Sequence, residues 1–130
     1  MKKIEFTLEL PQNPKGTAQQ IRHTQHGHYI PRLLRQTMAI YMEALKDKVD
    51  EMWTGPLSVR IEFYYSTKDK KKHGTWKTSI PDCDNIVKPL LDCMTRTGFW
   101  MDDSQIVDLH VSKKWSAAPA INIRVKEMVE

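Results

Sequence analysis

The chain has 130 residues, of which 40% are hydrophobic and 28% are charged, and its formal net charge is +4. This length and composition predict one globular domain, residues 1–130, with a modest hydrophobic core. No apolar run approaches the roughly 20 residues that cross a bilayer, so we exclude a membrane-spanning segment and expect a soluble, cytoplasmic protein.

The first half of the chain shows strand and helix patterns in turn. "MKKIEFTLEL" alternates apolar with polar residues, which predicts a strand with one buried face rather than a signal peptide. A polar loop, residues 11–30, follows, and a helical pattern then runs from Pro31 to Met52, where "TGP" ends it. Residues 57–65 alternate again and predict a second strand.

The polar loop contains three histidines, His23, His26 and His28. They lack the helical spacing and the neighbouring acid that a zinc site would need. We therefore interpret them as loop histidines and not as metal ligands.

A basic loop, residues 68–77 ("KDKKKHGTWK"), follows the second strand. Its five lysines and one aspartate give a net charge of +4, which equals the excess of the whole chain. A positive segment on an otherwise balanced body favours a polyanionic partner. A solvated loop that keeps the protein soluble is the simpler alternative.

The second half begins with a helix pattern after the acids of "SIPDCDNIVKPLLD", and Gly98 is placed to end it. Pro89 favours a helix start at Asp84 or Asn85. The two cysteines, Cys83 and Cys93, lack zinc spacing and are expected to be reduced. Two further strands carry apolar residues at 107, 109 and 111 and at 121, 123 and 125. Four strands and two helices predict an α+β fold with the helices on one face of the sheet.

The acids around the second helix are the candidate catalytic residues. Asp84 suits the N-cap of the helix, and Asp82, two residues earlier on an extended segment, should point to the same side. Lys88 follows one helical turn after Asp84. Asp103 is expected to open the next strand with its side chain towards the helices. Such a fold would gather Asp82, Asp84 and Asp103, and hard carboxylate ligands suit Mg²⁺ or Mn²⁺.

This arrangement permits phosphodiester hydrolysis, in which a metal ion lowers the pKa of water and Lys88 offsets developing negative charge. Ordinary structural roles account for the same residues. Asp84 would cap the helix, Asp82 would form a turn, and Lys88 would pair with Asp92 on the surface. Spacing alone favours these structural roles.

A longer motif changes that balance. "PDCDNIVKPLLDCMTRTGFWMDDSQIVDLHVSKKW", residues 81–115, closely resembles the core of the RusA family of endodeoxyribonucleases, the Holliday-junction resolvases. The shared pattern is D-x-D-N, a lysine, an L-D pair, a turn containing glycine, and D-D-x-Q before a strand. It covers about 35 residues in the right order, while the first half of the chain is compatible in layout and has little motif content.

The resemblance implies a RusA-like mixed four-stranded sheet and a homodimeric, Mg²⁺-dependent enzyme that nicks two opposing strands of a four-way DNA junction symmetrically, in recombination and repair. Mn²⁺ is expected to substitute for Mg²⁺. The family's essential aspartates match Asp82, Asp84 and Asp103, and its essential lysine matches Lys88; the role of Asp102 is open. The protein would act in the cytoplasm, encoded by a bacterial host or a phage.

The DNA-binding residues follow from the basic loop: we predict Lys70, Lys71, Lys72, Trp76 and Lys77. The lysines would hold phosphates, and Trp76 would either stack on an unpaired base or pack at the base of the loop. Phe99 and Trp100 are expected in the core or a dimer interface. His110 is expected on the opposite face of its strand.

A second function remains open at this point. A non-cleaving module of related fold would bind branched DNA through the basic loop and would not need the acids. All four expected active-site positions are filled, which favours the nuclease.

Overall fold

The computed structural model describes residues 2–15, 22–24, 27–29 and 32–129. His26 lies outside these residues, and the side chains of His23 and His28 are likewise not described. The elements in chain order are β1 (Lys3–Glu9), β2 (Arg22–Thr24), β3 (Gly27–Tyr29), α1 (Arg32–Leu45), β4 (Leu57–Ser66), α2 (Cys83–Thr97), β5 (Ile106–Ser116) and β6 (Ala120–Glu127). Short 3-10 helices at Lys70–Lys72 and Asp103–Gln105 precede α2 and β5 respectively.

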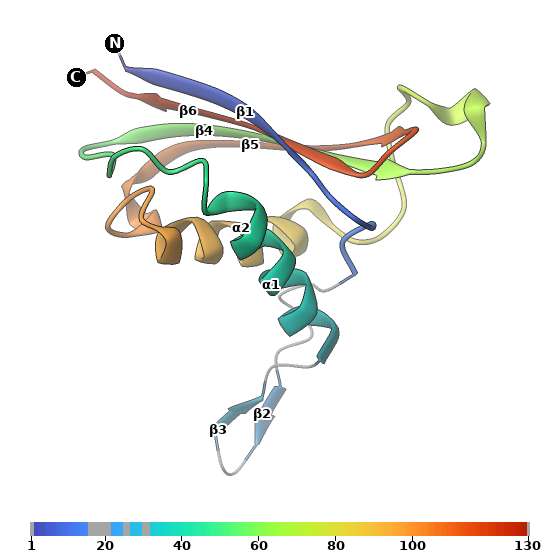
Figure 1. The fold of residues 1–130 in the computed structure, drawn as a ribbon, viewed down its shortest axis with the longest axis horizontal. Helices are drawn as coiled ribbons and strands as arrows, with labels where there is room; N and C mark the ends of the chain where they lie inside the picture. Colours follow the sequence, from blue (N-terminus) through green and yellow to red (C-terminus); the bar gives the residue numbers. More distant parts are fainter. Residues whose placement is uncertain (1, 16–21, 25–26, 30–31, 130) are drawn as a thin grey trace.

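The main sheet has the strand order β1-β6-β4-β5. β6 runs antiparallel to β1 and β4, whereas β4 and β5 are parallel, so the sheet is mixed. Both long helices lie on the same face of this sheet (Figure 1). The predicted α+β fold, with a mixed four-stranded sheet and two helices on one face, is therefore confirmed.

The core lies between the sheet and the two helices. The strands β1, β4 and β6 turn every second residue towards it, as the period of a pleated strand requires; on β4 these are Leu57, Val59, Ile61, Phe63 and Tyr65. The helices close the core with one apolar face each, including Leu34, Tyr41 and Leu45 of α1 and Ile86, Leu90 and Met94 of α2. The other face of the sheet carries polar side chains and has no helix over it (Figure 1).

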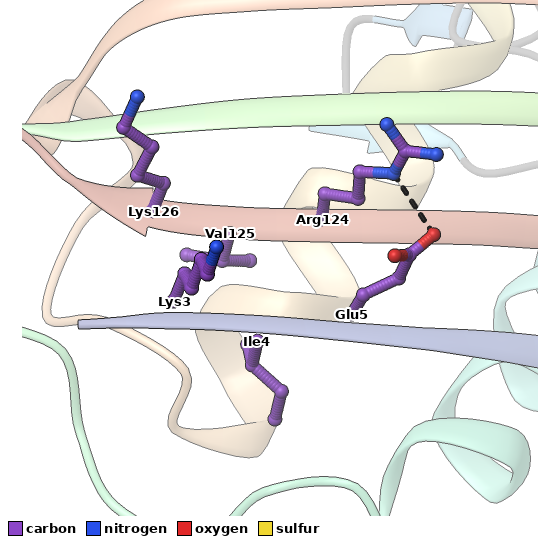
Figure 2. A pocket seen from close by; sticks show the side chains of 6 residues that line it. All are labelled: Lys3, Ile4, Glu5, Arg124, Val125 and Lys126. Carbon is purple, nitrogen blue, oxygen red and sulfur yellow. Dashed lines mark hydrogen bonds and ion pairs between the residues drawn. The ribbon is translucent and has the colours of Figure 1, made fainter. Parts of the chain in front are cut away.

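That open face is hollowed over β1 and β6. Figure 2 shows the pocket there, lined by Lys3, Ile4, Glu5, Arg124, Val125 and Lys126. Arg124 Nε donates to Glu5 Oε2 at 2.9 Å across the two strands. The pocket shares no residue with the acids of α2.

Three local predictions were wrong. The segment expected as a loop, residues 11–30, contains the antiparallel pair β2–β3. Helix α1 ends at Leu45 and not at Met52, because the chain turns back there and Trp53 pairs with the segment after α2, its N–H donating to Phe99 O at 2.7 Å.

The third difference lies in β5. Val107 and Leu109 were expected in the core, yet they are 63% and 41% exposed. The pairing with β4 shifts register, since Leu57 faces Ile106 while Ser58 faces Asp108, so Val107 is an extra residue. β5 is also an edge strand, which leaves this end of it uncovered. Within the described ranges, no helix is long and apolar enough to traverse a membrane.

Candidate active site

The first turn of α2 carries two of the predicted catalytic acids. Asp82 is the N-cap residue, in extended conformation, and its carbonyl oxygen accepts the N–H groups of Asn85 and Ile86, both at 3.1 Å. Asp84 lies one residue inside the helix. The predicted N-cap at Asp84 was therefore wrong by two residues, and Pro89 lies inside the helix.

The carboxylates of Asp82 and Asp84 have no partner among the residues that the structure describes. Both residues are exposed, and neither side chain has a hydrogen bond or ion pair with any residue that the structure describes. Asp82 does not use its carboxylate as a cap, although it stands at the cap position. Both groups are therefore free to bind a cation from solution.

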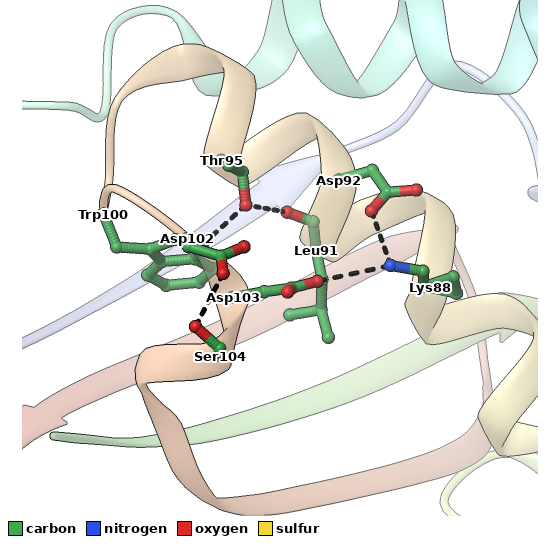
Figure 3. Close-up of polar contacts among 8 residues, drawn as sticks. All are labelled: Lys88, Leu91, Asp92, Thr95, Trp100, Asp102, Asp103 and Ser104. Atoms are coloured by element: carbon green, nitrogen blue, oxygen red, sulfur yellow. Dashed lines mark hydrogen bonds and ion pairs between the residues drawn. The ribbon is translucent and has the colours of Figure 1, made fainter.

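Lys88 connects α2 to the turn before β5 that carries Asp102 and Asp103, which we call the acidic turn. Its ammonium donates to Asp92 Oδ1 at 2.9 Å, one turn further along the helix, and to Asp103 Oδ2 at 3.3 Å (Figure 3). The hydrogen bond that Lys88 donates to Asp92, followed by the charge of Asp92 and the contact with Asp103, raises the pKa of Lys88. Lys88 therefore remains charged, and it holds Asp103 beside the helix face that begins with Asp84.

Asp103 reaches this place from a different element than predicted. It belongs to the 3-10 helix Asp103–Gln105, and β5 begins only at Ile106. The prediction that Asp103 lies near the second helix is confirmed by its contact with Lys88. The prediction that it opens the strand is wrong, because the turn is closed first by Gln105, whose side-chain oxygen accepts the N–H of Met101 at 2.9 Å.

Asp102 pairs with its own turn and not with Lys88. Ser104 Oγ donates to Asp102 Oδ2 at 2.6 Å (Figure 3). This hydrogen bond is the largest cause of a lowered pKa for the Asp102 carboxyl. In the structure, Asp102 thus stabilises the turn that carries Asp103.

A divalent cation fits the chemistry of Asp82, Asp84 and Asp103, because carboxylate oxygens are the ligands that Mg²⁺ and Mn²⁺ prefer. The three are not gathered in a ready-made site. Among residues 2–15, 22–24, 27–29 and 32–129, no three His, Cys, Asp or Glu side chains group closely enough to hold a metal ion. Carboxylates without a cation repel one another, and Asp103 is neutralised by Lys88. Their convergence around one ion stays a prediction.

The basic loop presents some of its predicted residues to solvent. Lys70, Lys71 and Lys72 form an exposed 3-10 helix, capped by the carboxylate of Asp69, which accepts the N–H of Lys71 at 3.1 Å. Trp76 is 63% exposed, and the ammonium of Lys114 lies 4.5 Å from the centre of its ring. Trp76 does not pack at the base of the loop.

Lys77 has the opposite environment. It is 7% exposed, and its ammonium donates to Ser79 and to the carbonyl of Ile80. The prediction that Lys77 binds DNA does not agree with this placement, because the ammonium is directed inward. Lys113, which sequence reasoning missed, donates to the same segment at Ser79 O and Pro81 O. Its only signal was that it shares the parity of Val111 on β5.

The two aromatic residues before the acidic turn belong to the core. Phe99 is 1% exposed and Trp100 is fully buried. Trp100 Nε1 donates to Thr95 Oγ1 at 2.7 Å, which ties the turn to α2 (Figure 3). His110, as predicted, is exposed and lies beside Asp108, with 3.2 Å between Nε2 and Oδ1.

Known proteins resemble this chain over most of its length. The family model described as endodeoxyribonuclease RusA matches residues 11–126. The crossover junction endodeoxyribonuclease rusA of Lactococcus phage r1t is 33% identical over 130 residues, which cover 97% of this chain and 99% of the phage protein.

Two further relatives match shorter stretches. The uncharacterized protein YqaN of Bacillus subtilis (strain 168) is 32% identical over 100 residues, 68% of this chain and 70% of that protein. The crossover junction endodeoxyribonuclease RusA of Escherichia coli (strain K12) is 34% identical over 58 residues, 45% of this chain and 40% of that protein.

Proposed function

Because the chain belongs to the RusA family of endodeoxyribonucleases, we propose that it resolves four-way DNA junctions by paired, symmetric nicks that need a divalent metal ion. The observation that carries the catalytic part is the pair of exposed carboxylates at the start of α2, which have no partner among the described residues, on the same helix as Lys88, whose ammonium pairs with Asp103. Three acids and a lysine from two neighbouring elements suit hydrolysis of a phosphodiester more closely than they suit a surface that only binds DNA.

Asp82, Asp84 and Asp103 would hold the metal ion, which is Mg²⁺ with Mn²⁺ as a substitute. When bound, the ion lowers the pKa of water and offsets the charge of the scissile phosphate. Lys88 has two roles in the proposal. Before a metal ion binds, its ammonium neutralises Asp103, and during cleavage it stabilises negative charge on the phosphate oxygens.

The DNA would lie over the basic loop. The exposed ammonium groups of Lys70, Lys71 and Lys72 would contact phosphates, and the exposed ring of Trp76 would stack on an unpaired base. Lys114 beside this ring adds positive charge on the same side of β5. A homodimer would present two identical sites to the two strands that are cut.

The test is the Asp82→Asn variant with Mg²⁺ and a synthetic four-way junction. We expect binding to be retained and nicking to disappear, because the amide keeps the shape of the side chain and removes a charged ligand. The matched control is Asp47→Asn, which changes an exposed acid in the turn after α1 and should cut like the wild type.

Two results would contradict the proposal. If Asp82→Asn cuts at the wild-type rate, the metal site is elsewhere. If the wild type binds the junction and cuts with neither Mg²⁺ nor Mn²⁺, the chain is a non-cleaving binding module.

A further inference from the structure

Three consecutive carbonyl groups lead into the acidic start of α2, and each accepts a hydrogen bond from a lysine. Lys113 Nζ donates to Pro81 O at 2.7 Å and to Ser79 O at 2.8 Å. Lys77 Nζ donates to Ile80 O, to Ser79 Oγ at 2.7 Å and to Ser79 O at 3.3 Å. We call Lys77 and Lys113 the lysine clamp.

Backbone pairing brings the two lysines to the same place. The end of the basic loop lies along the outer edge of β5, where Lys77 N–H donates to Lys113 O and Trp115 N–H donates to Thr75 O, both at 3.0 Å. Side chains alternate along such a pair. Trp76 therefore lies on the open side with Lys114, while Lys77 points inward, with its ammonium 4.8 Å from the ring of Trp115.

The burial of Lys77 is unfavourable by itself. Moving an ammonium out of water costs free energy unless it is well hydrogen-bonded, and burial, together with the charge of Lys113, lowers the pKa of Lys77. No carboxylate among the described residues pairs with Lys77 or Lys113. An apolar side chain could fill the space beside Tyr65 and Trp115 without this cost. The contacts that a lysine adds are those to the segment Ser79–Pro81.

That segment sets the position of the proposed metal ligands. Asp82 follows Pro81 directly, and no described residue pairs with its carboxylate and could orient it. The orientation of this carboxylate therefore depends on the backbone. Within the described part of the chain, the side chains of residues 82–85 make a single hydrogen bond to β5, the long contact from Cys83 Sγ to Val111 O at 3.8 Å. The lysine clamp provides the other hydrogen bonds that attach the start of α2 to β5.

We propose that Lys77 and Lys113 are positioning residues, which hold the backbone before α2 so that Asp82 and Asp84 face one metal ion. The inference rests on the proposed metal site and adds two residues to it. Groups that orient metal ligands from behind typically change metal affinity by about 10- to 100-fold when they are removed.

The test measures Mn²⁺ binding to the DNA-free protein by electron paramagnetic resonance of the free ion, and junction binding without metal. Lys113→Met should weaken Mn²⁺ binding by about tenfold or more and leave metal-free junction affinity unchanged. Lys113→Arg, which keeps a charged donor, should recover part of the Mn²⁺ affinity. The matched control is Lys114→Met, the neighbouring lysine on the open side of the same strand, which should bind Mn²⁺ like the wild type.

Lys77→Met is the second variant of the lysine clamp and should also weaken Mn²⁺ binding. Because Lys77 is buried, the thermal unfolding of this variant is measured together with its Mn²⁺ affinity, to show that the protein is folded. Wild-type Mn²⁺ affinity in Lys113→Met overturns the inference, and so does a loss confined to junction affinity, which would make Lys113 a phosphate contact. The Asp82→Asn variant separates the two proposals. If Asp82→Asn binds Mn²⁺ normally, the metal site and the inference both fail; if only the clamp variants bind normally, the inference alone fails.

Discussion

At the scale of single residues, a substitution of Lys88 can distinguish an effect on metal affinity from an effect on the cleavage rate. The ammonium of Lys88 lies 3.3 Å from Asp103 Oδ2, and the proposed metal ion needs the same carboxylate as a ligand. In the proposal, Lys88 and the metal ion therefore compete for one carboxylate, and the ammonium that the metal ion displaces becomes available to the phosphate. The two roles predict opposite effects on affinity and rate.

We expect Lys88→Met to lower the rate of junction cleavage at saturating Mn²⁺ by about 100-fold or more, the usual effect of removing a group that stabilises transition-state charge. Mn²⁺ affinity should not fall, because the competing cation is gone. Single-turnover cleavage and Mn²⁺ titration measure the two quantities. If Mn²⁺ raised above the concentration that saturates the wild type restores the cleavage rate of the variant, Lys88 acts in metal binding and not on the phosphate.

The sequence identified the acids but not their supports. Asp82, Asp84, Lys88 and Asp103 stand out because their spacing resembles a family motif. Lys77 was wrongly grouped with the exposed lysines, since all of them lie in one basic segment. The direction of Lys77 depends on pairing between residues 75–77 and β5, a long-range contact that local composition does not reveal.

At the scale of elements, the ends of the helices show which sequence signals were sufficient to predict where a helix begins or ends. Gly98 ends α2 as predicted, because its φ of 96° lies in the left-handed region that glycine adopts without strain. The start of α2 was misplaced because Asp82 and Asp84 are equally good caps by residue type. The end of α1 depends on tertiary contacts of Trp53, which the helical pattern does not contain.

The basic loop predicts a salt effect that belongs to this element. Replacing Lys70, Lys71 and Lys72 together by alanine should weaken junction binding and reduce the slope of log affinity against log salt by up to about 3, since each phosphate contact contributes nearly one unit. The measurement is junction affinity at several salt concentrations without metal. The control replaces Lys46 and Lys48, which are exposed in the turn after α1. An unchanged slope in the triple variant would place the loop away from DNA.

At the scale of the whole molecule, the period of apolar residues was enough to predict the four strands of the main sheet, the two long helices and the face that the helices cover, but not the pair β2–β3. The strand order was not predictable, because it depends on which edges pair and not on which faces are apolar. The register shift at the start of β5 reversed the expected parity of Val107 for the same reason. Pairing between distant segments decides both features.

The proposed homodimer predicts coupled cleavage. With a supercoiled plasmid that carries a cruciform, the wild type should produce linear DNA without accumulating nicked circles, because two sites in one complex cut both strands before it dissociates. Adding an excess of Asp82→Asn protein should shift the product to nicked circles through mixed dimers. In solution the wild type should have twice the 15.2 kDa mass of one chain. A monomeric mass, or products that ignore the inactive protein, would contradict the dimer.

The parallel pair β4–β5 has a consequence for the order of folding. Val59 pairs with Leu109, so the basic loop with Lys77, α2 and the acidic turn all lie in the connection between these two strands, while Lys113 lies on β5 itself. Long loops close slowly, since chain entropy is lost before the contacts form. We therefore expect the antiparallel part of the sheet to form first and the nuclease site to assemble last. Local opening of the β5 edge would then abolish metal binding while most of the secondary structure persists.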